Sequence, residues 1–312
     1  MIKIKDLNPG IRIYEKLLVI NATKGVTNNG NLYLNILLQD NTGQIEAKLW
    51  DATPYDEENL VPGNIVELVA DVLDYRGSLQ LKIIEHKLVD PSNVDLANFV
   101  MSSEIAIEDL EKELIKVLKS IKDKEVSAIV THLVNKYYDE FIHYPAATRN
   151  HHEYLGGLLE HTLSMVKIAD LLFSHYQDID RDILVGGILL HDLGKTIELS
   201  GPVVTRYTVE GRLVGHISLG SAEIFKAAEE LKITSEVPVL LSHLVLSHHG
   251  KMEFGSPVVP MTKEAFILSL IDNLDSKLKI IDKALEITEE GEFTDRIWAL
   301  DNISLYKPLK RK

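Results

Sequence analysis

The 312-residue chain carries a formal net charge of −14 at pH 7 and contains no cysteine. The lack of cysteine excludes disulfides and thiolate metal sites, so any metal ion would be held by histidine and carboxylate side chains. The excess of acidic residues argues against a broadly basic nucleic-acid-binding surface. Because no apolar run reaches membrane-spanning length, we expect a cytoplasmic protein with no membrane partner.

Residues 1–90 have the pattern of a small β-barrel. Five segments rich in β-branched and apolar residues, near 11–23, 32–39, 44–50, 65–73 and 79–88, are separated by turn sequences such as Asp40-Asn41-Thr42-Gly43. A short helix is predicted after Thr53-Pro54, between the third and fourth segments. Five strands with a helix in this place are typical of an OB-fold barrel.

Barrels of this type bind single-stranded nucleic acid through aromatic side chains and a few cations. The candidate contacts are Arg12, Tyr33, Trp50 and Arg76, with Tyr14, Lys48 and Tyr75 beside them. The alternative for any one of these aromatic residues is an ordinary place in the barrel core.

After Asp90 the apolar spacing becomes helical. Residues 91–148 are predicted to form a helical connector, 149–290 an all-α domain and 291–312 a C-terminal extension. A hairpin is expected at 203–213, around Glu210-Gly211. The expected fold class is therefore a multi-domain chain of α and β parts, with a five-stranded OB-type barrel followed by an all-α domain.

An apolar helix that begins near Ile183 ends in the adjacent residues His191 and Asp192. Both lie at helical spacing from apolar residues and should point toward the core, where polar groups are costly unless something occupies their lone pairs. Other apolar helices in this half carry histidine or aspartate in the same way. The candidate metal ligands are His161, His191, Asp192, His216, His248, His249 and Asp272. A single buried histidine or aspartate is usually structural, but the whole set predicts a metal centre. In the helix that ends at His191, Gly186-Gly187 predicts a close approach of the backbone to a neighbouring element.

The ordered set His161, His191-Asp192 and Asp272, with Gly194-Lys195 after the central pair, resembles the HD superfamily of metal-dependent phosphohydrolases over about residues 150–285. The resemblance implies an HD domain at 149–290 in which these four ligands hold one ion. It also implies that His216, His248 and His249 hold a second ion, with Asp192 as the bridge. Two such ions would clamp a phosphoryl group and generate the attacking hydroxide.

The segment His151-His152-Glu153-Tyr154-Leu155-Gly156-Gly157, together with the barrel, resembles the YhaM-type 3′-to-5′ exoribonucleases over nearly the whole chain. The resemblance implies release of nucleoside monophosphates from single-stranded RNA, with single-stranded DNA as a further substrate. It implies Mn²⁺ as the metal, with Fe, Ni, Co and Mg as alternatives.

Asp192 and Lys195 are the predicted catalytic residues, Lys195 neutralising phosphate charge; a solvated lysine at a helix end is the alternative. His151 and His152 are candidate substrate contacts, and a structural hydrogen-bonding role is their alternative.

Two other functions stay open at this point. One is an HD phosphohydrolase of mononucleotides or cyclic nucleotides that uses the barrel for assembly, although the residues after His248-His249 lack the Gly-Tyr-Pro signature of members that cut cyclic di-GMP. The other is a non-catalytic single-strand-binding protein with a residual metal site. A homo-oligomer is compatible with all three.

Overall fold

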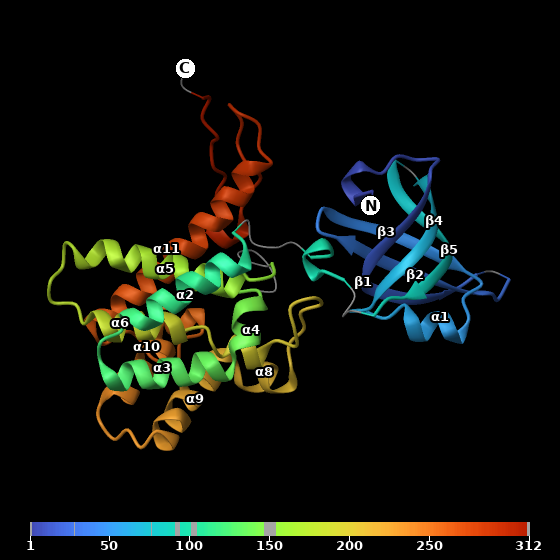
Figure 1. Cartoon of the computed structure of the whole chain (residues 1–312). Coiled ribbons are helices and arrows are strands. Elements are labelled where there is room, and N and C mark those ends of the chain that lie inside the picture. The colour runs from blue at the N-terminus through green and yellow to red at the C-terminus, as the bar shows by residue number, and fades with distance from the viewer. Residues whose placement is uncertain are drawn as a thin grey trace. The chain divides into compact units, whose positions relative to one another are not determined.

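The computed structural model describes residues 2–27, 29–75, 77–90, 94–100, 105–146 and 154–310 (Figure 1). The chain divides into two compact units, Met1–Ser102 and Ser103–Lys312. Within the described ranges, no helix combines the length and the apolar character that crossing a membrane requires. The finer division expected at residues 90, 148 and 290 stays a prediction.

The first unit is a closed barrel whose five strands follow the order β1-β2-β3-β5-β4. Neighbouring strands pair antiparallel, except β3 with β5, which pair parallel. Helix α1 (Pro54–Asn59) lies between β3 and β4 and begins at a capping box formed by Thr53 and Asp56. This topology is that of an OB-fold and confirms the predicted fold. The strands are β1 (Arg12–Val26), β2 (Leu32–Asp40), β3 (Gly43–Trp50), β4 (Ile65–Tyr75) and β5 (Ser78–Leu88).

Side chains on β2 and β3 alternate between the barrel interior and its outer surface. The inward positions are apolar and buried: Leu34, Ile36, Leu38, Ile45, Ala47 and Leu49. Because successive side chains of a strand point to opposite faces, Tyr33 and Trp50 face outward rather than into the core.

The described part of the second unit is helical, with three isolated β-bridges. Most of its α-helices contribute to one apolar core, the helices within residues 107–143 included. The helices are α2 (Ile107–Ser120), α3 (Lys124–Lys136), α4 (Tyr138–His143), α5 (Gly157–Phe173), α6 (Arg181–Leu190), α7 (Lys195–Glu198), α8 (Val209–Val214), α9 (His216–Glu230), α10 (Val237–Ser247) and α11 (Lys263–Glu286). The chain also has 3₁₀ turns η1 (Ile4–Asp6), η3 (Leu96–Asn98), η4 (Met252–Phe254) and η5 (Trp298–Leu300).

Helix α6 lies at the centre of this core and packs against α3, α5, α10 and α11. Asp180 begins the helix by accepting hydrogen bonds from the backbone N–H groups of its second and third residues, both at 3.1 Å. Every residue from Ile183 to Leu190 is buried. A Cβ added at Gly187 would lie 2.1 Å from Cδ2 of Leu244 on α10, so this glycine permits the close approach that the sequence predicts.

The hairpin expected at residues 203–213 is wrong. A single bridge joins Leu199 to Tyr207, and residues 209–214 form α8 instead. Thr208 accepts a hydrogen bond from the backbone N–H of Gly211 at 2.9 Å and so caps the helix. Gly211 serves a close approach rather than a turn, because a Cβ there would lie 2.3 Å from the carbonyl oxygen of Glu198.

Candidate metal centre

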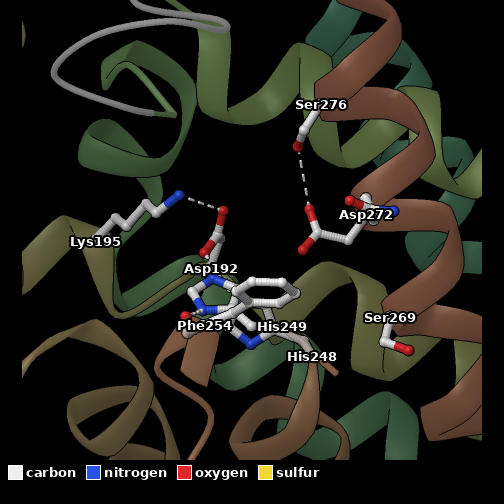
Figure 2. A pocket seen from close by; sticks show the side chains of 9 residues that line it. Asp192, Lys195, His248, His249, Phe254, Ser269, Asp272 and Ser276 are labelled. Carbon is white, nitrogen blue, oxygen red and sulfur yellow. Dashed lines mark hydrogen bonds and ion pairs between the residues drawn. The ribbon is translucent and has the colours of Figure 1, made fainter. Parts of the chain in front are cut away.

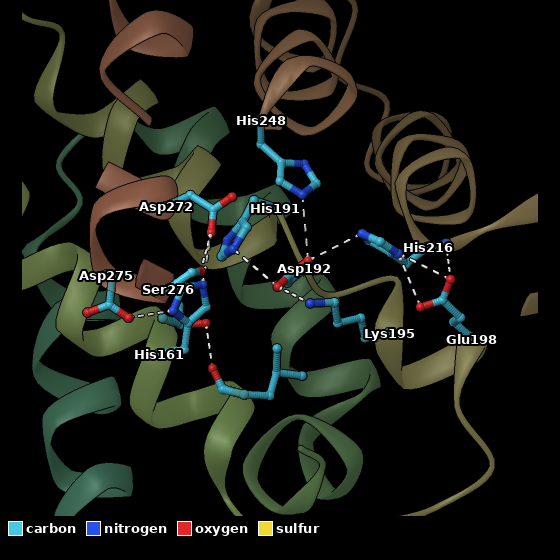
Figure 3. A network of polar contacts seen from close by, with 12 residues as sticks. His161, His191, Asp192, Lys195, Glu198, His216, His248, Asp272, Asp275 and Ser276 are labelled. Atoms are coloured by element: carbon cyan, nitrogen blue, oxygen red, sulfur yellow. Dashed lines mark hydrogen bonds and ion pairs between the residues drawn. The ribbon is translucent and has the colours of Figure 1, made fainter. Parts of the chain in front are cut away.

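The structure brings the candidate metal ligands together. Figure 3 shows His161, His191, Asp192, His216, His248 and Asp272. Their ligand atoms form two groups, each with all members within 4.8 Å of one another. The first group comprises His161 on α5 and His191 and Asp192 after α6; the second comprises His216 on α9 and His248 and His249 after α10. Asp272 on α11 joins the first group, since its Oδ1 lies 3.2 Å from Nε2 of His161.

A hydrogen bond at Nδ1 sets the orientation of the central histidines. His191 donates to the carbonyl of Ile188 and His248 to that of Val245, both at 2.7 Å. A carbonyl oxygen only accepts, so the proton of each neutral ring is on Nδ1 and the lone pair is on Nε2. Those Nε2 atoms are buried, and within the described residues they have no hydrogen-bond partner; the same holds for Nε2 of His216.

Two carboxylates that the sequence analysis missed orient the other buried histidines. Oδ2 of Asp275 lies 2.7 Å from Nδ1 of His161. Oε2 of Glu198 lies 3.1 Å from Nδ1 of His216, and its Oε1 accepts the backbone N–H of the same residue at 3.0 Å. A carboxylate behind a ligating imidazole fixes the ring and raises its basicity. Asp275 could have been found in the sequence, because it follows Asp272 by three residues on one helix face.

The carboxylate of Asp192 lies between the two groups (Figure 3). Its Oδ1 is 3.5 Å from Nε2 of His216 and 3.7 Å from Nε2 of His248. Its Oδ2 is 3.4 Å from Nε2 of His191 and 2.6 Å from Nζ of Lys195. A single carboxylate that faces both groups has the placement of a bridging ligand.

Charge at the centre favours the forms that bind metal. Burial alone would raise the pKa of Asp192, but Lys195 and His191 outweigh it and hold that pKa well below its usual range. Burial lowers the pKa of His248 well below its usual value and also lowers that of His249. At neutral pH this carboxylate is therefore ionised and these two imidazoles are neutral, as metal ligands must be.

His161 behaves differently from the other histidines. Burial acts to lower its pKa, but the hydrogen bonds to Asp272 and Asp275 outweigh burial and raise the pKa to about 9. In the metal-free protein His161 is consequently an imidazolium at neutral pH, and a metal ion would have to displace its proton.

The donor set fits divalent cations. Nε2 of His191, His216 and His248 and Oδ1 of Asp192 are buried acceptors that no hydrogen-bond donor of the described residues satisfies. Leaving a buried polar atom unpaired costs about 1–3 kcal/mol. Imidazole nitrogen and carboxylate oxygen suit Mn, Fe, Co, Ni or Zn.

A cavity of about 250 Å³ opens beside the centre (Figure 2). Lys195 contributes to its wall with a side chain that is only 12% exposed, so it is not the solvated lysine that was the alternative. The cavity is lined by Asp192, Lys195, His248, His249, Phe254, Ser269, Asp272, Asn273 and Ser276.

Two of the barrel residues predicted to contact substrate form an outward aromatic pair. Tyr33 and Trp50 pair across β2 and β3, and their ring centroids lie 5.1 Å apart. The ammonium of Lys48 lies 5.3 Å from the first ring centre and 5.2 Å from the second. A cation held over aromatic rings is a common feature of single-strand-binding surfaces.

Of the other predicted contacts, Arg12, Tyr14 and Tyr75 lie among the described residues. Arg12 is exposed but pairs with Asp71 through hydrogen bonds of 2.7 and 3.1 Å, and together with Trp50 it lines an outer groove of about 490 Å³. Tyr14 and Tyr75 are also exposed, at 70% and 55%. Arg76, His151 and His152 lie outside the described residues.

Comparison with known proteins identifies a domain family within the helical unit. Residues 158–277 match the family model of the HD domain. Similar solved structures include the second OB-fold domain of replication protein A from Methanococcus maripaludis, PriB from Ralstonia solanacearum and the mitochondrial single-stranded DNA-binding protein Rim1 from S. cerevisiae. Their identities are 21%, 17% and 17%, they cover 30%, 25% and 25% of this chain and 97% of their own, and their TM-scores are 0.24, 0.22 and 0.20. The family match shows that the helical unit carries an HD domain, which indicates a metal-dependent phosphohydrolase, beside the closed five-stranded barrel.

Proposed function

We propose that this protein is a cytoplasmic, metal-dependent 3′-to-5′ exoribonuclease that releases nucleoside monophosphates from single-stranded RNA and accepts single-stranded DNA. The observation that carries the hydrolytic part is the buried Asp192 carboxylate, which faces two groups of histidine nitrogens and forms one wall of a cavity. The polarity of cleavage rests on the resemblance of the sequence motifs.

This centre would hold two divalent ions, with Mn²⁺ as the expected metal. His161, His191, Asp192 and Asp272 would bind one ion, and His216, His248 and His249, with Asp192 shared, would bind the other. Bound ions of this kind polarise a phosphoryl oxygen and lower the pKa of water.

The remaining residues of the site position and balance charge. Glu198 and Asp275 hold the imidazoles of His216 and His161 with their Nε2 atoms toward the centre. Lys195 places a cation 2.6 Å from Asp192 on the cavity wall, where it can also meet a phosphate oxygen.

The outer surface of the barrel supports a single-stranded substrate. Tyr33, Lys48 and Trp50 present two aromatic rings and a cation on the outward faces of β2 and β3. Every base has a π face, so such a surface binds a strand with little sequence preference. Local stacking of this kind does not need a basic surface over the whole protein, which suits a chain with a net charge of −14.

Product analysis of a 5′-labelled single-stranded RNA incubated with Mn²⁺ tests the proposal. We expect a ladder that shortens from the 3′ end together with nucleoside monophosphates. Asp192→Asn should abolish the ladder, and Asp170→Asn, at a half-exposed position on α5, should leave it intact. RNA left whole while free or cyclic nucleotides are hydrolysed would replace the proposal with a mononucleotide phosphohydrolase. RNA that is bound but not cut would replace it with a non-catalytic binder.

A further inference from the structure

Phe254 is an exposed aromatic residue on the wall of the metal-centre cavity. The residue is 61% exposed, whereas the rest of that wall consists of charged and polar side chains. Neither metal binding nor core packing requires an aromatic ring at this place. A large exposed ring beside a polar site indicates a ligand that has an apolar face next to its charged group.

The backbone ties Phe254 to one of the candidate metal ligands. Its carbonyl accepts a hydrogen bond from Nδ1 of His249 at 2.8 Å. The backbone N–H of His249 donates to Oγ of Ser256 at 3.1 Å, and Gly255, with φ of +99°, allows the chain to turn between these two contacts. The backbone that carries the ring is therefore held next to the candidate metal centre, and Figure 2 draws Phe254 among the residues of the cavity.

The charges around this wall suit a nucleotide. The ammonium of Lys251 lies 5.3 Å from the centre of the Phe254 ring and 3.1 Å from Oε1 of Glu253. Asn273 and Ser276 on α11 add polar side chains to the same cavity. A volume of about 250 Å³ lies just below the range of roughly 300–1,000 Å³ for small-molecule sites, so the cavity takes one nucleotide rather than a duplex.

We propose that Phe254 stacks on the base of the nucleotide whose phosphate lies at the metal centre. The site thereby selects a nucleotide that retains its base over a bare phosphodiester. Because stacking uses the π face that all bases share, it selects no particular base. The inference rests on the proposed function, since it assumes that the phosphate belongs to a nucleic acid.

Ligand binding tests the stacking without any turnover. The Mn²⁺-loaded full-length protein is titrated by calorimetry with adenosine 5′-monophosphate and with ribose 5-phosphate, in which a hydroxyl group replaces the base at C1′. We expect the nucleotide to bind about 5- to 150-fold more tightly, as one stacked base predicts. Phe254→Ala should remove this difference while leaving the affinity for ribose 5-phosphate unchanged, and Phe254→Trp should retain it.

Phe293→Ala is the matched control, because Phe293 is 66% exposed and lies outside the cavity. It should change neither affinity. The stacking proposal is overturned if Phe254→Ala weakens both ligands equally or weakens neither. If Phe254→Ala loses Mn²⁺, Phe254→Leu is used instead, because leucine keeps an apolar side chain without a π face. The proposal is also overturned if Phe254→Leu keeps the full difference in affinity between the two ligands.

Turnover separates this inference from the proposed function. When the 3′-terminal nucleotide of the RNA lacks its base, the kcat/KM of the wild-type protein should fall by the same factor as the ligand affinity. Phe254→Ala should cut the intact RNA and the RNA without this base at the same reduced rate. If the wild-type protein cuts neither RNA, the exoribonuclease proposal fails, whereas the comparison of the two small ligands still decides whether Phe254 stacks.

Discussion

Each imidazole of the metal centre has one nitrogen committed before any ion binds. The carbonyls of Ile188 and Val245 accept hydrogen bonds from the Nδ1–H groups of His191 and His248, and Glu198 accepts one from Nδ1 of His216. An imidazole whose tautomer is already fixed loses less free energy on binding an ion than one that must first reorganise. Residues that never touch a metal ion thus determine how well the centre holds it.

Glu198→Gln tests this dependence. The amide retains an oxygen that can accept one hydrogen bond from His216, but it loses the negative charge and one of the two acceptors. We expect the affinity for Mn²⁺, measured by calorimetry, to fall about 10- to 100-fold. Glu210→Gln, at an exposed position on α8, should have no effect; equal affinities for the two variants would show that Glu198 does not orient the ligand.

The raised pKa of His161 makes the stability of the metal-free protein depend on pH. The folded-state pKa of about 9 exceeds the ordinary value of 6.5 because Asp272 and Asp275 favour the imidazolium over the neutral ring, in spite of burial. The stabilisation is therefore complete below about pH 6.5 and is lost as the pH rises through about 9. Its upper limit is about 3 kcal/mol.

Urea unfolding of the wild-type protein and of His161→Gln, both with a chelator, measures this contribution. The stability advantage of the wild type over the variant should shrink as the pH rises through about 9. An advantage that is constant with pH, or that grows, would rule out a stabilising imidazolium at this position.

At the level of elements, the close contact between α6 and α10 sets where His191 and Asp192 lie. A methyl group at Gly187 would meet Leu244 at 2.1 Å, whereas one at Gly220 on α9 would have its nearest neighbour, Cγ1 of Val245, at an ordinary 3.4 Å. We expect Gly187→Ala to destabilise the fold by about 1–3 kcal/mol through overpacking and Gly220→Ala to be neutral or slightly stabilising through helix propensity. Thermal unfolding of both variants gives the comparison, and equal stability would mean that this contact is not tight.

The predictions from sequence were most accurate where one periodicity dominates. β-Branched and apolar segments bounded by turn sequences identified the barrel strands. Helical spacing identified the buried positions that carry the candidate ligands, because burial of one helix face depends on local spacing. The hairpin around Gly211 was mispredicted because a glycine that admits the backbone of Glu198 looks the same in sequence as a turn glycine.

The residues that the sequence analysis missed depend on distant contacts. Glu198 reaches His216 across 18 residues, and Asp275 reaches His161 across 114. Phe254 lines the cavity, and its carbonyl accepts a hydrogen bond from His249. No spacing rule identifies Glu198 or Phe254, so a folded structure is needed to find them, whereas Asp275 shares a helix face with Asp272 and could have been found from its spacing.

At the level of the whole molecule, we expect the barrel to bind the strand and the helical unit to hydrolyse it. Trp50→Ala should weaken the binding of a long single-stranded RNA about 5- to 150-fold, because one stacking surface is lost, and it should leave cleavage of a dinucleotide unchanged. The chain has two tryptophans, and Trp298→Ala, 80% exposed in the other unit, is the matched control for fluorescence-anisotropy binding. An equal loss on the long and the short substrate would assign the barrel a structural role.

The central claim is that Asp192 is shared by two ions, and the amount of Mn²⁺ retained per chain tests it most directly. After equilibrium dialysis at a controlled concentration of free Mn²⁺, elemental analysis should find two ions per wild-type chain and no more than one per Asp192→Asn chain. Circular dichroism checks that both proteins are folded. One ion in the wild type, or two in both proteins, would contradict a centre bridged by Asp192.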